Sequence, residues 1–265
     1  MFTREDASEN DVLMDELMRK FNIHYRACIG ALIYLTATLV DISFAVQKLA
    51  KFSSCPGHVH FVALVHLLRY LRDNSYLGLK YYSDANDAPL ADLLRSAAIR
   101  TSSPLIAFSD SSWQDCPDTG RSTGMYIIFY MGGPVDHSTH VPGPVAQSSA
   151  ESEYNSAGTS GMALSHFRMM NSELEGKDPD ELPSDPPPII LDSKAGVDMS
   201  KNGKDSKHTR HIARRVHFVR QGEAQGFHTV CWCETDLKLA DIGTKYVRAD
   251  ELQPRLSYMM LVVDP

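Results

Sequence analysis

The sequence predicts an α/β protein, of the α+β-like kind, with a mixed sheet. From residue 104 onward, short apolar segments of strand length alternate with longer segments of helical periodicity. Their order is three strands, a helix, a strand, a helix, a strand and a helix, which is typical of helices packed on a sheet. The chain has 265 residues, 43% of them hydrophobic. That is enough apolar material for one large or two modest domains.

The first third of the chain has a helical pattern. Phe61, Leu64 and Leu68 recur at the spacing of one helix face, and Pro56 and Gly57 separate that segment from the preceding helix. The start of the chain is polar and acidic, and residues 89–103 are weakly patterned. The predicted organisation is therefore a flexible lead-in (1–22), a helical subdomain (23–88), a linker (89–103) and a sheet domain (104–265).

Each element of the sheet domain has its own signal. Gly, Pro and Ser clusters bound the apolar segments, as expected for strands. Ser148 followed by Glu151 forms a capping box, which predicts that a long helix starts there and runs to about Glu175. The predicted strands are Pro104–Phe108, Met125–Tyr130, one beginning at Pro134, Ile189–Leu191 and Phe227–Trp232. Two further helices are predicted, within 208–220 and from about Asp236 onward.

Four acidic residues occupy strand ends and helices. Asp110 closes the first strand, Glu153 lies in the first turns of the long helix, Asp192 ends the fourth strand and Asp241 falls in the predicted C-terminal helix. Such positions at one sheet edge can converge on a single pocket, where divalent cations relieve the repulsion between carboxylates. Oxygen ligands suit Mg²⁺ or Mn²⁺, and two such ions can cleave a phosphodiester. Since an Asp at a strand end is commonly a turn residue, the carboxylates alone leave the function open.

Charge and cysteine content bear on the partner and the cellular compartment of the protein. The net charge of -7 argues mildly against a nucleic-acid partner, but residues 201–220 contain seven Lys or Arg against Asp205. That segment fits either a basic binding face or a solvated helix surface. Five scattered cysteines favour a reducing compartment, and Cys231 and Cys233 fit core packing better than metal binding. The N-terminus lacks a signal peptide, and we expect an intracellular, non-secreted protein without a membrane partner.

Eight short segments of the sequence, taken in their order along the chain, can be compared with known families. Two of them are YRACIGALIYLTATLVDISFAVQKLAKF (25–52) and HFVALVHLLRYLRDNSYLGLKYY (60–82). The other six are FSDSSW (108–113), GRSTG (120–124), SSAESEY (148–154), LDSKAGVDMSKN (191–202), KHTRHIARRVHFVR (207–220) and LADIGTK (239–245). The first two resemble the end of the reverse transcriptase in copia-type LTR retrotransposon polyproteins, and the other six resemble the RNase H domain of that family.

The resemblance implies a fold, an activity and a set of catalytic residues. The fold is an RNase H-like five-stranded mixed sheet flanked by helices. The activity is hydrolysis of the RNA strand of RNA/DNA hybrids during reverse transcription, with 3′-hydroxyl and 5′-phosphate products. The metal-binding, catalytic residues are Asp110, Glu153, Asp192 and Asp241, which hold two Mg²⁺ ions, or Mn²⁺. Glu151, two residues from Glu153, has the capping role.

The resemblance also implies how the substrate is bound. Residues after Asp192 lie near the hybrid backbone, which proteins read through phosphates and 2′-hydroxyls. These substrate-binding residues are Asn202, Lys207, His208, Arg210 and His211. The implied partners are the hybrid and the rest of the retrotransposon polymerase, in a cytoplasmic particle or the nucleus.

The chain departs from the family pattern in places. Leu39 and Val40 stand where Arg-Pro is usual, and the segment 137–141 lacks two lysines that related chains carry. No paired-Asp polymerase hairpin precedes the helical segments, so we do not expect DNA synthesis by this chain alone. The alternative function is a catalytically inactive remnant that at most binds nucleic acid. The four acidic residues favour the enzyme, and the helical segments before Asp110 disfavour a more distant two-metal nuclease or integrase.

Overall fold

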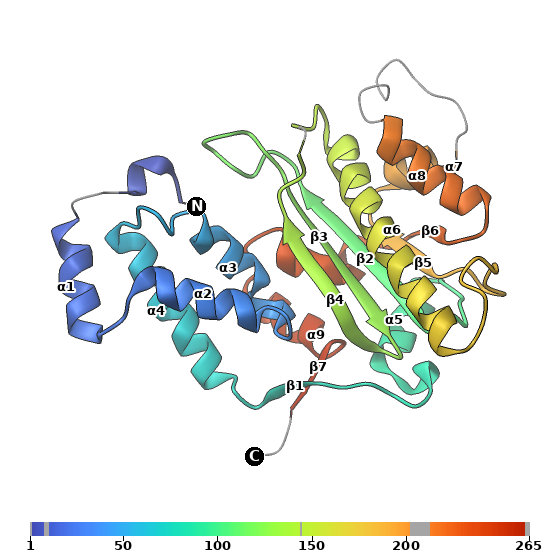
Figure 1. Ribbon diagram of the computed structural model, residues 1–265, viewed down its shortest axis with the longest axis horizontal. Helices are drawn as coiled ribbons and strands as arrows, with labels where there is room; N and C mark the ends of the chain where they lie inside the picture. Colours follow the sequence, from blue (N-terminus) through green and yellow to red (C-terminus); the bar gives the residue numbers. More distant parts are fainter. Residues whose placement is uncertain (1, 8–10, 144, 202–212, 263–265) are drawn as a thin grey trace. The chain divides into compact units, whose positions relative to one another are not determined.

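The computed structural model describes residues 2–7, 11–143, 145–201 and 213–262 (Figure 1). The chain divides into two compact units. The helical unit comprises Met1–Gly78, with Pro117–Thr119 and Val262–Pro265, and the sheet unit comprises Leu79–Cys116 and Gly120–Leu261. Two short strands, β1 (Leu77–Leu79) and β7 (Met260–Val262), pair with each other in a separate two-stranded sheet.

The helical unit packs its helices around an apolar core. Its elements are the short 3₁₀ helices Arg4–Asp6 and Val40–Ile42, and the helices α1 (Val12–Phe21), α2 (Tyr25–Leu35), α3 (Ser43–Ala50) and α4 (His58–Asp73). Ile29, Leu32, Phe61 and Leu64 are almost completely buried in the core. The predicted helical pattern of this segment therefore corresponds to real helices, whose apolar faces are shielded from water.

Part of the expected flexible lead-in is a helix. The Asp11 side chain accepts a hydrogen bond from Met14 N at 3.0 Å and caps α1. Met14 on that helix is buried in the core of the unit. The amphipathic stretch was visible in the sequence, but its ordering depends on this cap and on burial of Met14.

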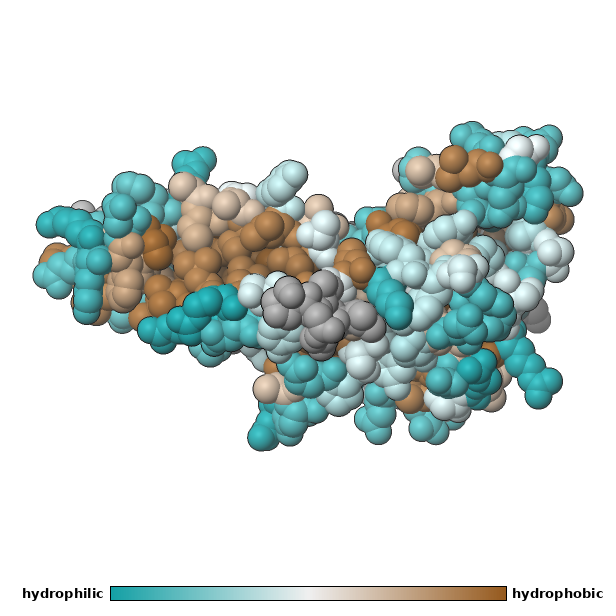
Figure 2. Space-filling model, turned by 90° about the horizontal axis from the view of Figure 1, so that it is seen from below, coloured by the Kyte–Doolittle hydropathy of each residue, from teal (hydrophilic) through white to brown (hydrophobic). Residues whose placement is uncertain are grey.

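The surface of the helical unit is rich in apolar side chains (Figure 2). Ile33, Tyr34 and Val62 are exposed by 52%, 81% and 58%. Exposed apolar patches of this kind are typical of surfaces that contact another polypeptide.

The sheet unit contains the mixed five-stranded sheet that the sequence predicts. Its strands are β2 (Leu105–Ser112), β3 (Thr123–Tyr130), β4 (Gly133–His140), β5 (Pro188–Leu191) and β6 (Thr229–Trp232), in the order β4-β3-β2-β5-β6. The β2–β3 and β3–β4 pairs are antiparallel, and the β2–β5 and β5–β6 pairs are parallel. The prediction of a five-stranded mixed sheet flanked by helices is confirmed.

Helices cover the sheet, and the longest of them packs across its centre. They are α5 (Pro89–Ser96), α6 (Ser149–Leu174), α7 (Lys194–Lys201), α8 (Ala213–Ala224) and α9 (Ala249–Leu256) (Figure 1). Tyr154, Ala157 and Leu164 of α6 join Ala107 and Ile128 of the sheet in one buried cluster. In the described part of the chain, no helix has the length and apolar composition that crossing a bilayer requires.

The start of α6 confirms the capping role of Glu151, with one difference. The Ser148 hydroxyl accepts a hydrogen bond from Glu151 N at 3.2 Å, as in a capping box. The Glu151 carboxylate, however, accepts from Gln147 N at 2.9 Å, one residue before the expected donor. Glu151 therefore helps to cap the N-terminus of α6.

Two segments differ from the sequence expectation. The expected linker 89–103 contains α5, where Pro89 occupies the first turn and Leu90, Leu93 and Leu94 are buried at helical spacing. Only two turns long, this helix gave too short a periodic signal to be recognised. Helix α7 directly after β5 was not predicted either.

The expected C-terminal helix from Asp236 is instead two short 3₁₀ helices, η5 (Thr235–Leu237) and η6 (Leu239–Gly243), followed by α9. All five residues of η6 are buried, so the segment has no polar face of the kind that a surface helix needs. A Cβ atom at Gly243 would lie 1.6 Å from Met125 Sδ on β3. A larger residue at position 243 would therefore have to displace the Met125 side chain.

A pH-dependent stability follows from His228, which is 2% exposed. Its Nε2 lies 2.9 Å from Val219 O, and burial lowers the pKa of the imidazole. The unfolded chain takes up a proton near pH 6.5, whereas the folded protein resists protonation. We therefore expect the free energy of unfolding to be fully retained above about pH 6.5 and to fall as the pH is lowered toward 5.

Tryptophan fluorescence during urea unfolding measures this effect selectively, because Trp113 and Trp232 are the two tryptophans and both belong to the sheet unit. The control is His228→Gln, whose amide can still donate to Val219 O but does not titrate. Its stability should depend less on pH between 7 and 5. Parallel pH profiles for parent and variant would contradict this account.

Candidate metal centre

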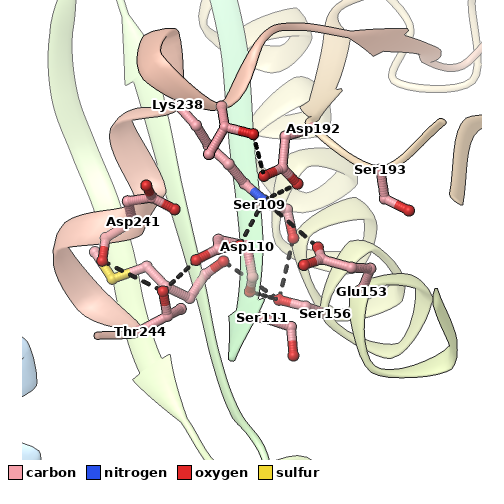
Figure 3. A network of polar contacts seen from close by, with 12 residues as sticks. Ser109, Asp110, Ser111, Glu153, Ser156, Asp192, Ser193, Lys238, Asp241 and Thr244 are labelled. Atoms are coloured by element: carbon pink, nitrogen blue, oxygen red, sulfur yellow. Dashed lines mark hydrogen bonds and ion pairs between the residues drawn. The ribbon is translucent and has the colours of Figure 1, made fainter. Parts of the chain in front are cut away.

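Three of the four predicted carboxylates converge at one end of the sheet. One carboxylate oxygen each from Asp110, Glu153 and Asp192 lie within 4.8 Å of one another (Figure 3). Asp110 is on β2 and Asp192 directly follows β5, the parallel neighbour of β2. Continuing the pairing of Phe108 with Ile190 brings Asp192 beside Asp110. We call these three residues the three-carboxylate cluster.

Helix α6 brings Glu153 to the cluster because small residues let it lie close to the sheet. The buried Ser156 hydroxyl donates to Asp110 O at 2.7 Å, and Ser109 donates to Ser156 at 3.1 Å. Ser111 and Ser152 are also in contact. These hydroxyl contacts fix the helix against β2, so the backbone positions of Asp110 and Glu153 are set by the same interface.

Asp241 does not join the cluster, contrary to the sequence expectation. Its carboxylate forms ion pairs with Lys245 Nζ at 2.7 Å and Arg255 Nη2 at 3.5 Å. In Figure 3 the carboxylate lies apart from the three-carboxylate cluster. The expectation placed Asp241 on a regular helix, whereas it lies in the 3₁₀ helix η6, with two cationic side chains holding its carboxylate.

Asp241 nevertheless remains close enough to interact electrostatically with the cluster. Burial, followed by the charge of Asp110, raises the pKa of Asp241 to about 6. Thr244, three residues later, donates its hydroxyl to Asp110 Oδ2. The segment that carries Asp241 therefore supports Asp110 directly through Thr244.

A lysine that the sequence reasoning missed lies among the three carboxylates. Lys238 Nζ is 2.5 Å from Asp110 Oδ1, contacts Asp192 Oδ1 and lies 3.6 Å from Glu153 Oε2 (Figure 3). Its side chain is fully buried. Lysine is rarely buried unless it is paired, so a lone Lys in the sequence is not expected to be interior. The available signal was its position between Leu237 and Leu239.

The pKa values of Asp110 and Glu153, which both lie near Lys238, shift in opposite directions. Burial alone would raise the pKa of Asp110, but Lys238 and the Thr244 hydroxyl lower it below its usual value. Burial raises the pKa of Glu153 to about 9, an effect that Lys238 opposes and the charges of Asp110 and Asp192 reinforce. The ammonium group of Lys238 therefore stabilises the charge of Asp110 better than that of Glu153.

The donor set fits a divalent cation. Glu153 Oε2 is buried and has no hydrogen-bond partner among the described residues. Three carboxylate oxygens in this proximity are the ligands that Mg²⁺ and Mn²⁺ prefer. The Lys238 ammonium contacts oxygens of the same three carboxyl groups.

The five predicted substrate-binding residues lie outside the described residues. They are Asn202, Lys207, His208, Arg210 and His211. Their segment runs between α7 and α8, after Asp192.

Comparison with known proteins finds similar sequences in transposon polyproteins. The chain is 29% identical over 221 residues to a retrovirus-related Pol polyprotein from transposon RE1 of Arabidopsis thaliana, covering 83% of this chain and 14% of that protein. It is 25% identical over 233 residues to the corresponding polyprotein from transposon TNT 1-94 of Nicotiana tabacum, covering 87% of this chain and 16% of that protein. The chain is homologous to retrovirus-related Pol polyproteins from copia-type transposons. No protein-family model matches it.

Other similar proteins match parts of the chain. Secreted RxLR effector protein 161 of Plasmopara viticola is 31% identical over 134 residues, which are 50% of this chain and 83% of that protein. A solved structure of LC11-RNase H1 in complex with an RNA/DNA hybrid has a TM-score of 0.38 and 13% identity, covering 53% of this chain and 93% of that chain. The N-terminal RNase H domain of a Mycobacterium tuberculosis protein has a TM-score of 0.37 and 13% identity, covering 57% of this chain and 94% of that chain.

The protein should lose stability when Thr244 no longer donates to Asp110. Thr244 is 1% exposed, and Thr244→Val keeps its shape but removes the hydroxyl. Loss of a hydrogen bond to a buried charged group should lower the free energy of unfolding by about 1.5–3 kcal/mol. Thr244→Ser keeps the hydroxyl and should lose only about 1 kcal/mol, the effect of one buried methyl group.

Urea unfolding followed by tryptophan fluorescence compares these variants with the parent. A Thr244→Val protein as stable as the parent would show that the hydroxyl does not support Asp110.

Proposed function

We propose that this chain is a metal-dependent endoribonuclease that hydrolyses the RNA strand of RNA/DNA hybrids during retrotransposon reverse transcription. The observation that carries the proposal is the convergence of one carboxylate oxygen each from Asp110, Glu153 and Asp192 within 4.8 Å, with Glu153 Oε2 buried and without a hydrogen-bond partner among the described residues. Similarity to retrovirus-related Pol polyproteins supports it. Residues 104–265 are the proposed nuclease domain, and 23–88 the proposed end of the reverse transcriptase.

The proposed ligands of Mg²⁺, or of Mn²⁺, are the residues of the three-carboxylate cluster. A bound ion would activate water for attack on the phosphodiester and stabilise the leaving oxygen. Asp241 is proposed to help hold a second ion, a role that requires its carboxylate to leave Lys245 and Arg255. Thr244 is a positioning residue, because its hydroxyl orients the Asp110 carboxylate.

The proposed substrate contacts lie after Asp192. A-form hybrid is recognised through phosphates and 2′-hydroxyls, so we expect little sequence preference. The proposed contacts are Asn202, Lys207, His208, Arg210 and His211. The chain spans 14% of the length of the RE1 polyprotein, and the exposed apolar surface of the helical unit fits a second proposed partner, the rest of the polymerase. The proposed setting is a cytoplasmic particle or the nucleus.

A second candidate function is a nucleic-acid-binding remnant without turnover. The observation that favours it is Lys238, whose ammonium contacts the oxygens that a catalytic ion needs. A protein in which this contact is permanent would keep the fold and lose the reaction.

Cleavage of a labelled RNA/DNA hybrid in the presence of Mg²⁺ separates the two functions. We expect cleavage by the parent, abolished by EDTA, and no cleavage of duplex DNA. Asp110→Asn should slow cleavage by at least about 100-fold, the scale of losing one group that stabilises transition-state charge. The matched control is Asp92→Asn, which makes the same chemical change at an exposed carboxylate of α5 and should leave the rate unchanged.

Binding to the same hybrid, measured by fluorescence anisotropy, completes the test. Binding without cleavage by the parent, at Mg²⁺ or Mn²⁺ concentrations that saturate the protein, would support the remnant. Equal cleavage by parent and Asp110→Asn would refute the proposed site.

A further inference from the structure

We propose that Lys238 is an internal cation of the three-carboxylate cluster that competes with the divalent ion, so that metal binding requires its ammonium to be displaced. The inference rests on the proposed function, because it assumes that the cluster is a metal site. It adds a residue that determines the metal affinity of that site.

Geometry makes the two cations mutually exclusive. The ammonium lies 2.5 Å from Asp110 Oδ1, contacts Asp192 Oδ1 and lies 3.6 Å from Glu153 Oε2. Mg²⁺ binds oxygen ligands at about 2.0–2.1 Å and requires a near-octahedral arrangement. An ion that uses the same three carboxylates would need the space that the ammonium fills. The cluster therefore holds either Lys238 or the ion.

Lys238 provides hydrogen bonds to only two of the three carboxyl groups in the cluster. Its hydrogen bonds go to Asp110 and Asp192, and Glu153 Oε2 is left without a hydrogen-bond partner in the described structure. A single positive charge also faces three carboxyl groups. A divalent cation would balance their charge better and would give Glu153 a partner.

The surrounding backbone allows the side chain to move without unfolding a helix. Lys238 is extended, with φ -81° and ψ 109°, between the 3₁₀ helices η5 and η6. Its carbonyl accepts a hydrogen bond from Arg255 Nε at 3.3 Å, which holds the backbone in place. The four-carbon stem of lysine is flexible, so the ammonium can leave while this backbone stays fixed.

The consequence is a site that is folded without metal and binds metal weakly. Removing a partner from a buried ion pair leaves uncompensated charge, so Lys238 stabilises the metal-free fold. The same contacts oppose metal loading.

Calorimetric titration of Mn²⁺ into the full chain tests the competition. Lys238→Gln should bind Mn²⁺ at least about 10-fold tighter than the parent, since one charge in contact changes the equilibrium of a neighbouring group by this much or more. The matched control is Lys177→Gln, which removes an exposed lysine paired with Glu175 and should bind like the parent. Equal Mn²⁺ affinities in the parent and Lys238→Gln would overturn the inference and leave the proposed function intact.

Failure of Mn²⁺ to bind any variant, Lys238→Gln included, would remove the metal site and with it the proposed function. If Lys238→Gln is unfolded without metal, its folding on addition of Mn²⁺ supports the inference, because the ion then replaces the missing ammonium. If the variant stays unfolded with Mn²⁺, the inference is tested by amine labelling of the parent protein instead.

That measurement is amine labelling of the parent, read by peptide mass spectrometry. Lys238 is fully buried and should resist acetylation without metal, then become reactive at saturating Mn²⁺. Exposed Lys177 is the internal control and should react equally in both conditions. A Lys238 that stays protected at saturating Mn²⁺ has not been displaced, and the inference is then wrong.

Discussion

The structure of the sheet unit depends on a buried cluster of charge. Asp110, Glu153 and Asp192 come from three different elements and carry more negative charge than a dry interior tolerates without compensation. In the metal-free protein the compensation is Lys238, which arrives from the C-terminal segment. The fold must therefore hold sheet, helix and C-terminal segment together at one point, and that point is the candidate metal centre.

Successive side chains of β2 point to opposite faces of the sheet, so the strand contacts different elements on its two faces. Ser109 faces α6 through Ser156, whereas the next residue, Asp110, faces the C-terminal segment through Thr244 and Lys238. One strand thus contacts the α-helix α6 on one side and the segment of the 3₁₀ helix η6 on the other. Gly243 permits the close approach of that segment to β3. The same residues stabilise the fold and form the candidate metal centre. Substitutions that weaken the three-carboxylate cluster should therefore lower both the stability of the protein and the proposed activity.

The sheet, its strand types and the long helix could be predicted because periodicity and the Ser148 cap are local signals. Convergence of Asp110 and Asp192 was also accessible, since both follow the ends of predicted strands. Burial of Lys238 and the separate pairing of Asp241 were not, because both follow from the 3₁₀ course of residues 235–243. That course is set by burial against the sheet rather than by local propensity. The helix α5 was missed for the opposite reason, as a local signal too short to recognise.

The chain thus combines a family relationship, a carboxylate cluster suited to a divalent ion and a lysine that already occupies the cluster. The most direct measurement is a crystal structure of the chain soaked in Mn²⁺, with the ion located by its anomalous scattering. The account predicts an anomalous peak within ligand distance of Asp110, Glu153 and Asp192, with the Lys238 ammonium moved away. A crystal at saturating Mn²⁺ with no peak at these residues, and with Lys238 still between them, would contradict it.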